Sequence, residues 1–320
     1  MQGASLIVPA PAKLNLFLHV TGRRADGYHT LESLLVLLDF GDTLTLRCRE
    51  DGGIVLARPL PGIPVESDLT YRAALLLKTH AGTTQGATIS LTKRIPLGAG
   101  LGGGSSDAAS VLLALNRLWK LDLSRAELMR IGLQLGADVP FFIFGSNAHV
   151  AGIGEVLRPV TVPRLAYLIG VPPIHVATAD IFAAPQLKRD TPASGADAFS
   201  LGFGRNDLQA VAAGLHGSIA TAITALDQTD FGKTGRAANT AARMSGSGSS
   251  VFRIIDRGFP ESEAAWRAAG DGQRDDWKFL QRIRYRSSKS HDAAGEPNGG
   301  PTLISARGLH HHPLREFAAK

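Results

Sequence analysis

Apolar and polar residues alternate in several short runs along the chain, and this pattern predicts β-strands. The clearest run covers residues 12–20, where Leu14, Leu16, Leu18 and Val20 share one face of the expected strand. Further strands are expected at 31–40, 42–48, 87–93, 165–171 and 251–255, with a strand pair within 148–159.

Apolar residues spaced three and four apart predict helices between these strands. Ser67 or Asp68 caps one helix, a second starts at Ser105, and Ser124 with Glu127 has the spacing of a capping box for a third. Because the strands come in groups and do not alternate regularly with helices, the order favours an α+β fold.

The composition sets the outer limits. The 320 residues are 44% hydrophobic, enough for a sizeable core and for two domains, which we expect at 1–160 and 161–256. Residues 257–320 form an atypical basic tail, and 277–320 show neither helical nor strand periodicity. No apolar run reaches the ~18 residues that span a bilayer, and no signal-peptide pattern opens the chain, so we expect a cytoplasmic protein with no membrane partner. The single cysteine, Cys48, cannot form an internal disulfide and is expected to be a buried thiol.

The formal net charge of +6 lies mostly in the tail. Residues 277–320 contain eight Lys or Arg against three Asp or Glu, which leaves one net positive charge for residues 1–276. The main body also lacks basic residues interleaved with stacking aromatics, so the charge argues against nucleic-acid binding there. RNA binding by the tail remains an alternative.

The run from Gly98 to Ser106 is the densest cluster of small residues, and it opens a helix. Glycines let backbone N–H groups converge and a helix start adds its positive end, so the run is typical of a phosphate-binding loop. It lacks the lysine of a Walker P-loop. It satisfies the dinucleotide pattern Gly-x-Gly-x-x-Gly, but Asp122, at the right distance, lies between two helical patterns and not at the end of a second strand. A flexible linker is disfavoured by the flanking strand and helix.

A second small-residue loop, residues 244–250, precedes the strand expected at 251–255. It is either a simple strand connection or the second wall of one polyanion site. Asp138 stands just before Pro140, where the chain turns, and spacing alone favours a helix cap over a functional carboxylate.

Two further pairs of residues could contact a ligand. Lys13 and Asn15 lie on the second face of the first strand, about 6.6 Å apart, although a solvated strand face is the plainer interpretation. Tyr28 and His29 follow an Asp-Gly turn and could stack on and hydrogen-bond a heterocycle, or simply pack.

Taken together, these segments resemble the GHMP kinase family. Six motifs within roughly residues 8–255 follow the order and spacing of that family: residues 11–16, 24–29, 98–109, 136–140, 206–208 and 244–248. Six ordered motifs are far more specific than one glycine pattern. The resemblance implies a two-domain fold, with an N-terminal domain like domain 2 of ribosomal protein S5 and a C-terminal ferredoxin-like α/β sandwich.

The resemblance also implies an ATP-dependent kinase that phosphorylates the 2-hydroxyl of a cytidyl diphosphate methylerythritol in the non-mevalonate isoprenoid route. Another small-molecule kinase of the family is the alternative. Lys13 and Asp138 are implied as the catalytic pair, with Asp138 accepting the hydroxyl proton. Mg²⁺ should bridge the ATP phosphates with few protein ligands, for which Ser106 is the one candidate. We expect the protein to be a monomer or a weak homodimer.

The resemblance implies two binding sets. The ATP phosphates are held by Pro96, Gly98, Ala99, Gly100, Leu101, Gly102, Gly103, Gly104, Ser105 and Ser106. The substrate is held by Asn15, Tyr28, His29, Thr178 and Phe182, with His29 reading the cytosine edge and Phe182 stacking on the base.

Overall fold

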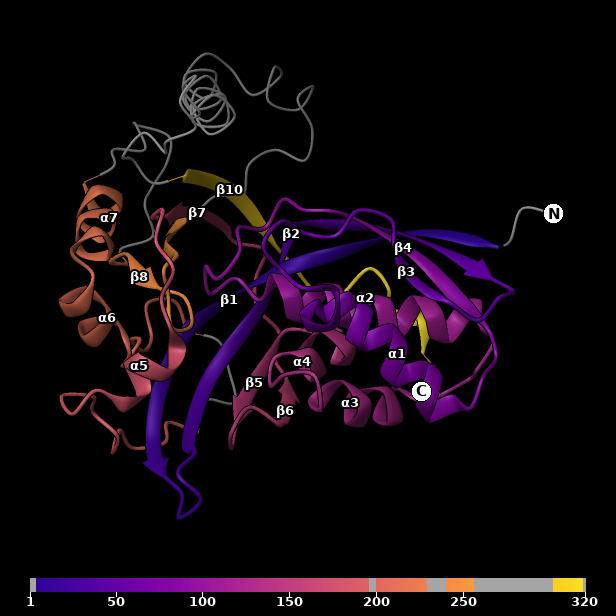
Figure 1. The fold of residues 1–320 in the computed structure, drawn as a ribbon. Helices are drawn as coiled ribbons and strands as arrows, with labels where there is room; N and C mark the ends of the chain where they lie inside the picture. Colours follow the sequence, from indigo (N-terminus) through magenta and orange to yellow (C-terminus); the bar gives the residue numbers. More distant parts are fainter. Residues whose placement is uncertain (1–3, 196–199, 229–239, 256–301, 319–320) are drawn as a thin grey trace, which may run out of the picture.

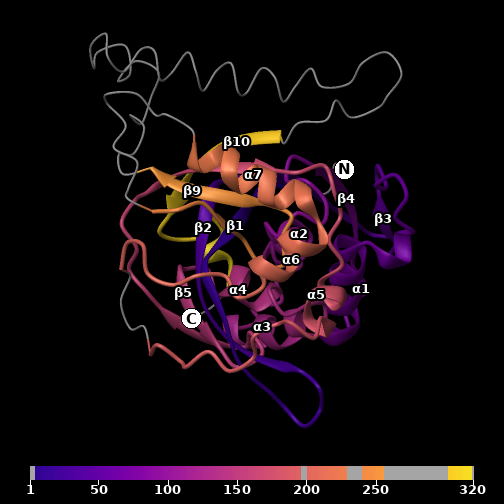
Figure 2. The same cartoon turned by 90° about the vertical axis from the view of Figure 1, so that its left-hand side faces the viewer.

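A ten-stranded sheet forms the centre of the computed structural model, which describes residues 4–195, 200–228, 240–255 and 302–318 (Figure 1). Its two longest strands, β1 (Ser5–Arg23) and β2 (His29–Arg49), pair antiparallel along their length. Their hairpin tip extends away from the rest of the fold in both views (Figures 1 and 2). The sequence therefore predicted the first strand correctly but underestimated its length.

The strands expected at 31–40 and 42–48 are one continuous strand, β2. The expected gap falls at Gly41, where the backbones of β1 and β2 approach closely. A Cβ at Gly41 would lie 2.3 Å from the carbonyl oxygen of Ala10 on β1. Only glycine fits there, so the residue marks a close approach of β1 to β2 within a continuous strand.

Four helices cover one side of the N-terminal strands (Figure 1). Helix α2 (Gly103–Leu118) lies against β1 and β2, and α1 (Leu69–Ala81), α3 (Arg125–Leu133) and α4 (Val139–Phe144) pack on it. The predicted cap of α1 is confirmed, because Asp68 accepts from the Thr70 backbone N–H at 2.8 Å. The Ser124–Glu127 capping box is confirmed as well. The remaining N-terminal elements are the 3₁₀ turn Val65–Ser67, β3 (Ile54–Leu56), β4 (Gly86–Thr92), β5 (Ala148–Ala151) and β6 (Val156–Pro159).

The C-terminal strands are β7 (Ala166–Val171), β8 (Arg243–Met244) and β9 (Val251–Ile255), which pair antiparallel in the order β7-β9-β8. Helix α7 (Gly217–Asp227) packs on β7 and β9, and it follows α6 (Gln209–Leu215) and α5 (Thr178–Ala183). Within the described ranges no single helix is long and apolar enough to cross a bilayer, and the bent pair α6–α7 meets that test only when both helices are taken together.

Strand β10 (Thr302–Leu309) corrects the expectation that residues 277–320 contain no strand. It pairs with β7 along most of its length and with β2 at Gly308 and Leu309, and so joins the two groups of strands into one sheet. The 3₁₀ turn Arg315–Phe317 follows it. The alternation is weak in the sequence because two of the three buried positions are Ala306 and Gly308, beside Ile304. Residues 256–301, most of the expected basic tail, lie outside the described residues.

Candidate active site

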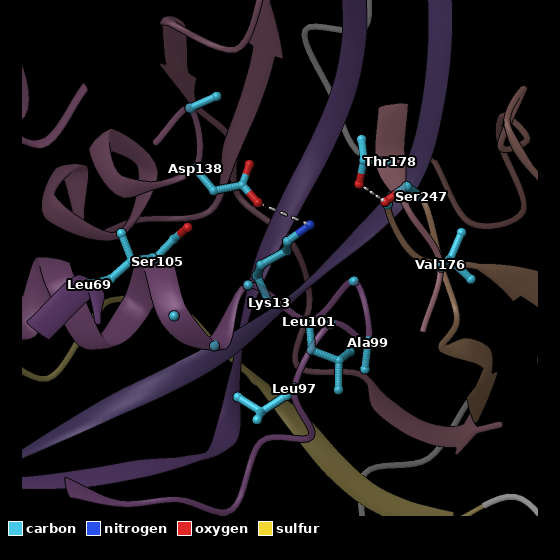
Figure 3. Close-up of a pocket in the computed structure, with 18 of the residues that line it drawn as sticks. Lys13, Leu69, Leu97, Ala99, Leu101, Ser105, Asp138, Val176, Thr178 and Ser247 are labelled. Carbon is cyan, nitrogen blue, oxygen red and sulfur yellow. Dashed lines mark hydrogen bonds and ion pairs between the residues drawn. The ribbon is translucent and has the colours of Figure 1, made fainter. Parts of the chain in front are cut away.

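A cavity of about 640 Å³ opens between the N-terminal helices and the C-terminal elements. Its walls come from segments far apart in the sequence: the loop 96–104, the loop 246–248, the start of α5, the residue before α4, and β1 (Figure 3). Fourteen of the seventeen residues implied by the resemblance line it: Lys13, Asn15, Pro96, Gly98, Ala99, Gly100, Leu101, Gly102, Gly103, Gly104, Ser105, Asp138, Thr178 and Phe182. Ser106, Tyr28 and His29 do not.

The first glycine loop has the backbone that its composition predicts. Gly98, Gly100 and Gly102 have φ angles of 64°, 74° and 72°, a region that residues with a side chain rarely adopt. Gly102 precedes α2 and offers no side-chain cap, so the first N–H groups of this helix are left for another acceptor. Gly103, Gly104 and Ser105 of that first turn line the cavity. The geometry fits an anion at the helix N-terminus.

The second small-residue loop packs directly on the first. The backbone N–H of Ser250 donates to the Ala99 carbonyl at 3.1 Å, and the Ser245 hydroxyl donates to the Gly100 carbonyl at 3.2 Å. A Cβ at Gly100 would lie 2.4 Å from the Ser245 carbonyl oxygen. The two loops are therefore adjacent walls of one cavity, and residues 244–250 are at the same time the hairpin connection between β8 and β9.

Lys13 is held in place at both ends. Its backbone N–H donates to the carbonyl of Leu101 in the first glycine loop at 3.0 Å. Its buried ammonium donates to Asn15 Oδ1 at 2.6 Å and lies 3.4 Å from Asp138 Oδ2 (Figure 3). Asn15 in turn donates to the Ser33 hydroxyl at 2.8 Å. The solvated-face interpretation of Lys13 and Asn15 is therefore wrong, because both side chains are buried and line the cavity.

Asp138 does not cap α4. Its backbone is already helical, with φ −84° and ψ −14°, and its side chain makes no capping hydrogen bond. Instead the carboxylate, whose side chain is 40% exposed, points toward Lys13 at the cavity wall (Figure 3). The prediction of a helix cap from spacing is therefore wrong. The carboxylate oxygens can still accept hydrogen bonds from a ligand.

The structure corrects the implied role of Ser106 in holding the ATP phosphates. Its side chain is fully buried and its hydroxyl donates to the Pro11 carbonyl at 2.6 Å. It ties α2 to β1 and does not face the cavity. Ser105 is the serine of this turn that does.

The other end of the cavity carries aromatic rings. The Thr178 hydroxyl at the start of α5 shares a hydrogen bond of 2.7 Å with Ser247 of the second loop (Figure 3). One turn later Phe182 lines the cavity and stacks on His29, with ring centroids 5.0 Å apart and an interplanar angle of 28°. Tyr28 sits at the hairpin tip with 64% of its surface exposed. His29 therefore contacts a residue of the cavity wall, Phe182, without lining the cavity itself. Tyr28 does not reach the cavity in this structure.

Sequence reasoning missed two groups beside the site. Arg189 donates from Nε to His29 Nε2 at 3.0 Å, and nothing in the motif Leu187–Thr191 distinguishes it from a surface arginine. Lys93 also lines the cavity and bridges the buried carboxylates of Asp42 and Asp107. The position of Lys93, directly after β4 and before the glycine loop, was a signal that could have found it.

Comparison with known proteins gives the family of the chain. Residues 68–146 match the family described as GHMP kinases N terminal domain. The chain is 46% identical over 315 residues to 4-diphosphocytidyl-2-C-methyl-D-erythritol kinase of Ralstonia nicotianae, covering 97% of this chain and 96% of that protein. It is 54% identical over 250 residues to the protein of the same name from Herminiimonas arsenicoxydans, covering 76% of this chain and 84% of that protein.

Solved structures give the same answer for the fold. A crystal structure of 4-(cytidine 5'-diphospho)-2C-methyl-D-erythritol kinase matches with a TM-score of 0.69 at 29% identity, covering 95% of this chain and 99% of that one. A crystal structure of mevalonate kinase, at 14% identity and a TM-score of 0.58, covers 95% of this chain and 99% of that one and shares the fold alone. The implied α+β GHMP kinase fold is confirmed. The chain belongs to the GHMP kinase family, among its 4-diphosphocytidyl-2-C-methyl-D-erythritol kinases.

Proposed function

We propose that this kinase transfers the γ-phosphoryl group of ATP to the 2-hydroxyl of 4-diphosphocytidyl-2-C-methyl-D-erythritol, the substrate in the names of its relatives. The observation that carries the proposal is the approach of Lys13 Nζ to Asp138 Oδ2, 3.4 Å apart, in a cavity that both glycine loops line. A phosphate cradle, a cation and a carboxylate then meet in one place.

The glycine loop and the start of α2 hold the triphosphate in this proposal. Phosphoryl transfer asks the protein mainly for alignment and for stabilisation of charge on the equatorial oxygens. Backbone N–H groups of residues 98–105 supply donors without a side chain in the way, and the helix dipole adds positive potential. The second loop closes the cradle through its hydrogen bonds to Ala99 and Gly100.

Asp138 accepts the proton of the attacking hydroxyl, and Lys13 stabilises charge on the transferred group. At ~4 Å a unit-charge pair attracts by about 4 kcal/mol at an effective dielectric near 20. An ionised aspartate is a weak base, so it orients the hydroxyl first and takes the proton late, which suits a loose transition state. Asn15 holds the ammonium, so little reorganisation is needed when charge develops.

Mg²⁺ fits this donor set. It prefers oxygen ligands and is usually held by substrate phosphates plus one or two protein groups. Within the described part of the chain no group of three or more His, Cys, Asp or Glu side chains is placed to hold a metal ion. Ser105 is the protein oxygen of the first turn of α2 that would contribute to its shell. When bound, the ion neutralises phosphate charge.

The aromatic end of the cavity holds the cytidine. Phe182 offers a face for the base, Thr178 closes the start of α5 onto the second loop, and Asn15 contacts the methylerythritol unit beside Lys13. His29 reads the edge of the cytosine, with Tyr28 folding onto the base from the exposed hairpin tip. We further propose domains at 1–160 and 161–256, with β10, from the expected tail at 257–320, lying in the sheet between their strands, and a cytoplasmic monomer or weak homodimer.

A panel assay tests the proposal. The purified chain is given ATP, Mg²⁺ and one alcohol at a time: the cytidyl substrate, mevalonate, homoserine or galactose. We expect turnover with the cytidyl substrate at least about 100-fold above the others in kcat/KM, since only it fills both ends of the cavity. Phosphorus NMR of the product must show a monoester at the 2-position. Preferred turnover of another alcohol would reject this substrate, and a strongly salt-dependent RNA shift without turnover would favour the RNA-binding alternative.

A further inference from the structure

Arg189 makes four hydrogen bonds with one guanidinium. Its Nε donates to His29 Nε2 at 3.0 Å, and Nη1 donates to the Leu187 carbonyl at 2.9 Å. Its Nη2 donates to the carbonyls of Phe182 and Ala184, at 2.9 and 2.8 Å. These two carbonyls belong to the last turn of α5 and the residue after it, where a cation is favoured. One side chain therefore fixes both members of the stacked pair, His29 and Phe182.

The segment that carries Arg189, residues 187–195, is itself anchored to the long hairpin. The Thr191 backbone N–H donates to the Val20 carbonyl on β1 at 3.0 Å. Further on, the backbone N–H groups of Ser194 and Gly195 donate to the buried carboxylate of Glu32 on β2, at 2.6 and 3.0 Å. The guanidinium is thus held by a segment with its own firm attachments, and its position does not depend on His29.

This contact determines the protonation state of His29. A guanidinium can only donate, so His29 Nε2 must accept and carries no proton. Burial lowers the pKa of His29, and the neighbouring charges of Arg189 and Arg23 lower it further. The ring is therefore neutral, with its one proton on Nδ1. For Nδ1 the described residues provide no hydrogen-bond partner, which leaves an N–H donor at the edge of a ring stacked on Phe182.

We propose that Arg189 is a positioning residue that fixes His29 as an Nδ1–H donor and thereby makes the site prefer cytosine over uracil. The step rests on the proposed function, which places the base at His29 and Phe182. Cytosine presents an acceptor at N3, with which a fixed N–H donor can pair, whereas O2 is an acceptor in both bases. Uracil carries a proton at N3, so a donor that faces N3 meets another donor, the hydrogen bond is not made, and binding should be at least about 10-fold weaker.

The test joins a spectroscopic readout with a binding ratio. Nitrogen-15 NMR of the wild-type chain should show His29 with protonated Nδ1 and bare Nε2. Calorimetry with CDP and with UDP should give at least about 10-fold tighter binding of CDP. In Arg189→Met the His29 signals should shift toward a mixture of tautomers, and the CDP-to-UDP ratio should fall toward one. Lys188→Met, at an exposed neighbouring position, is the matched control and should leave both readouts unchanged.

Arg189→Lys separates tautomer control from folding. It keeps a cation but cannot bridge the two α5 carbonyls and His29 together, so the base ratio should fall while the chain stays folded. The proposal is overturned by a proton on Nε2 in the wild type, by equal binding of CDP and UDP, by no binding of either, or by variants that keep the wild-type tautomer and ratio. Failure of the kinase assay alone would reject the proposed function, since the tautomer and the CDP preference are measured without turnover.

Discussion

Two lysine–carboxylate clusters line the same cavity, and they differ in what they leave free. Lys13 faces Asp138, whose side chain is 40% exposed, whereas Lys93 bridges Asp42 and Asp107, whose side chains are 0% and 2% exposed. Asp42 is also saturated by the backbone N–H groups of Arg94 and Ile95. The Lys93 cluster ties β2, the segment after β4 and α2 together, so it is a structural support. The Lys13 pair keeps an open carboxylate, which a substrate hydroxyl can use.

The largest effect should come from removing the open carboxylate. Asp138→Ala should lower kcat by about 10³-fold, within the range that a positioned base contributes, while ATP affinity stays within a few-fold. Lys13 then keeps its hydrogen bond to Asn15, so the cavity wall persists. Steady-state kinetics with calorimetric ATP titration checks this. Equal loss of turnover and ATP affinity would mean that Asp138 supports the fold and not the reaction.

Removing the positive charge of Lys13, opposite Asp138, should lower kcat by a smaller factor. Lys13→Met keeps the length of the side chain but removes the cation beside the transferred group, so we expect kcat to fall about 100-fold with a smaller change in nucleotide affinity. Lys120→Met, a change outside the cavity lining, is the control that should leave both unchanged. Unchanged kcat in Lys13→Met would exclude this lysine from the reaction.

The contact between the two loops gives a third, smaller effect. A Cβ at Gly100 would lie 2.4 Å from the Ser245 carbonyl oxygen and 2.8 Å from that of Gly248, at a φ of +74°. Gly100→Ala should therefore separate the loops and weaken ATP binding by about 10-fold, with about 2 kcal/mol lost in the free energy of unfolding. Gly214→Ala, where no heavy atom lies within 4 Å of the added Cβ, is the control. Wild-type ATP affinity in Gly100→Ala would show that the cradle tolerates separated loops.

The fold and the site differ in how much of each the sequence could predict. Local signals gave the caps of α1 and α3, the glycine loop and its helix, because each depends on residues a few positions apart. The pairing of Lys13 with Asp138 came only from the family resemblance, since 125 positions separate the two residues and spacing favoured a cap. Arg189 and β10 were missed for physical reasons. The contact of Arg189 with His29 depends on tertiary packing, and two of the three buried positions of β10 have little or no side chain to produce an apolar pattern.

The smallest expected effect is a pH dependence of stability in the Lys93 cluster. Burial raises the pKa of Asp107 to about 7 from 3.8; the charge of Lys93 opposes this rise and that of Asp42 adds to it. The folded state then holds a proton that the unfolded chain releases above about pH 4, so this group's contribution to stability is full below pH 4 and is lost as the pH rises to about 7.

Asp107→Asn removes that dependence and leaves Lys93 paired with Asp42. In the variant the amide oxygen can still accept from Lys93 at the position of Asp107 Oδ2, 2.8 Å away, but the acceptor no longer carries a charge at any pH. The informative quantity is therefore the difference in unfolding free energy between variant and wild type. It should change in the variant's favour by about 1–3 kcal/mol between pH 5 and pH 8, measured by urea unfolding. The matching variant of the open pair, Asp138→Asn, should lose activity. A flat difference for Asp107→Asn would mean that its carboxylate is ionised in the folded state at pH 5, with Lys93 outweighing burial, and that the two clusters differ in exposure alone.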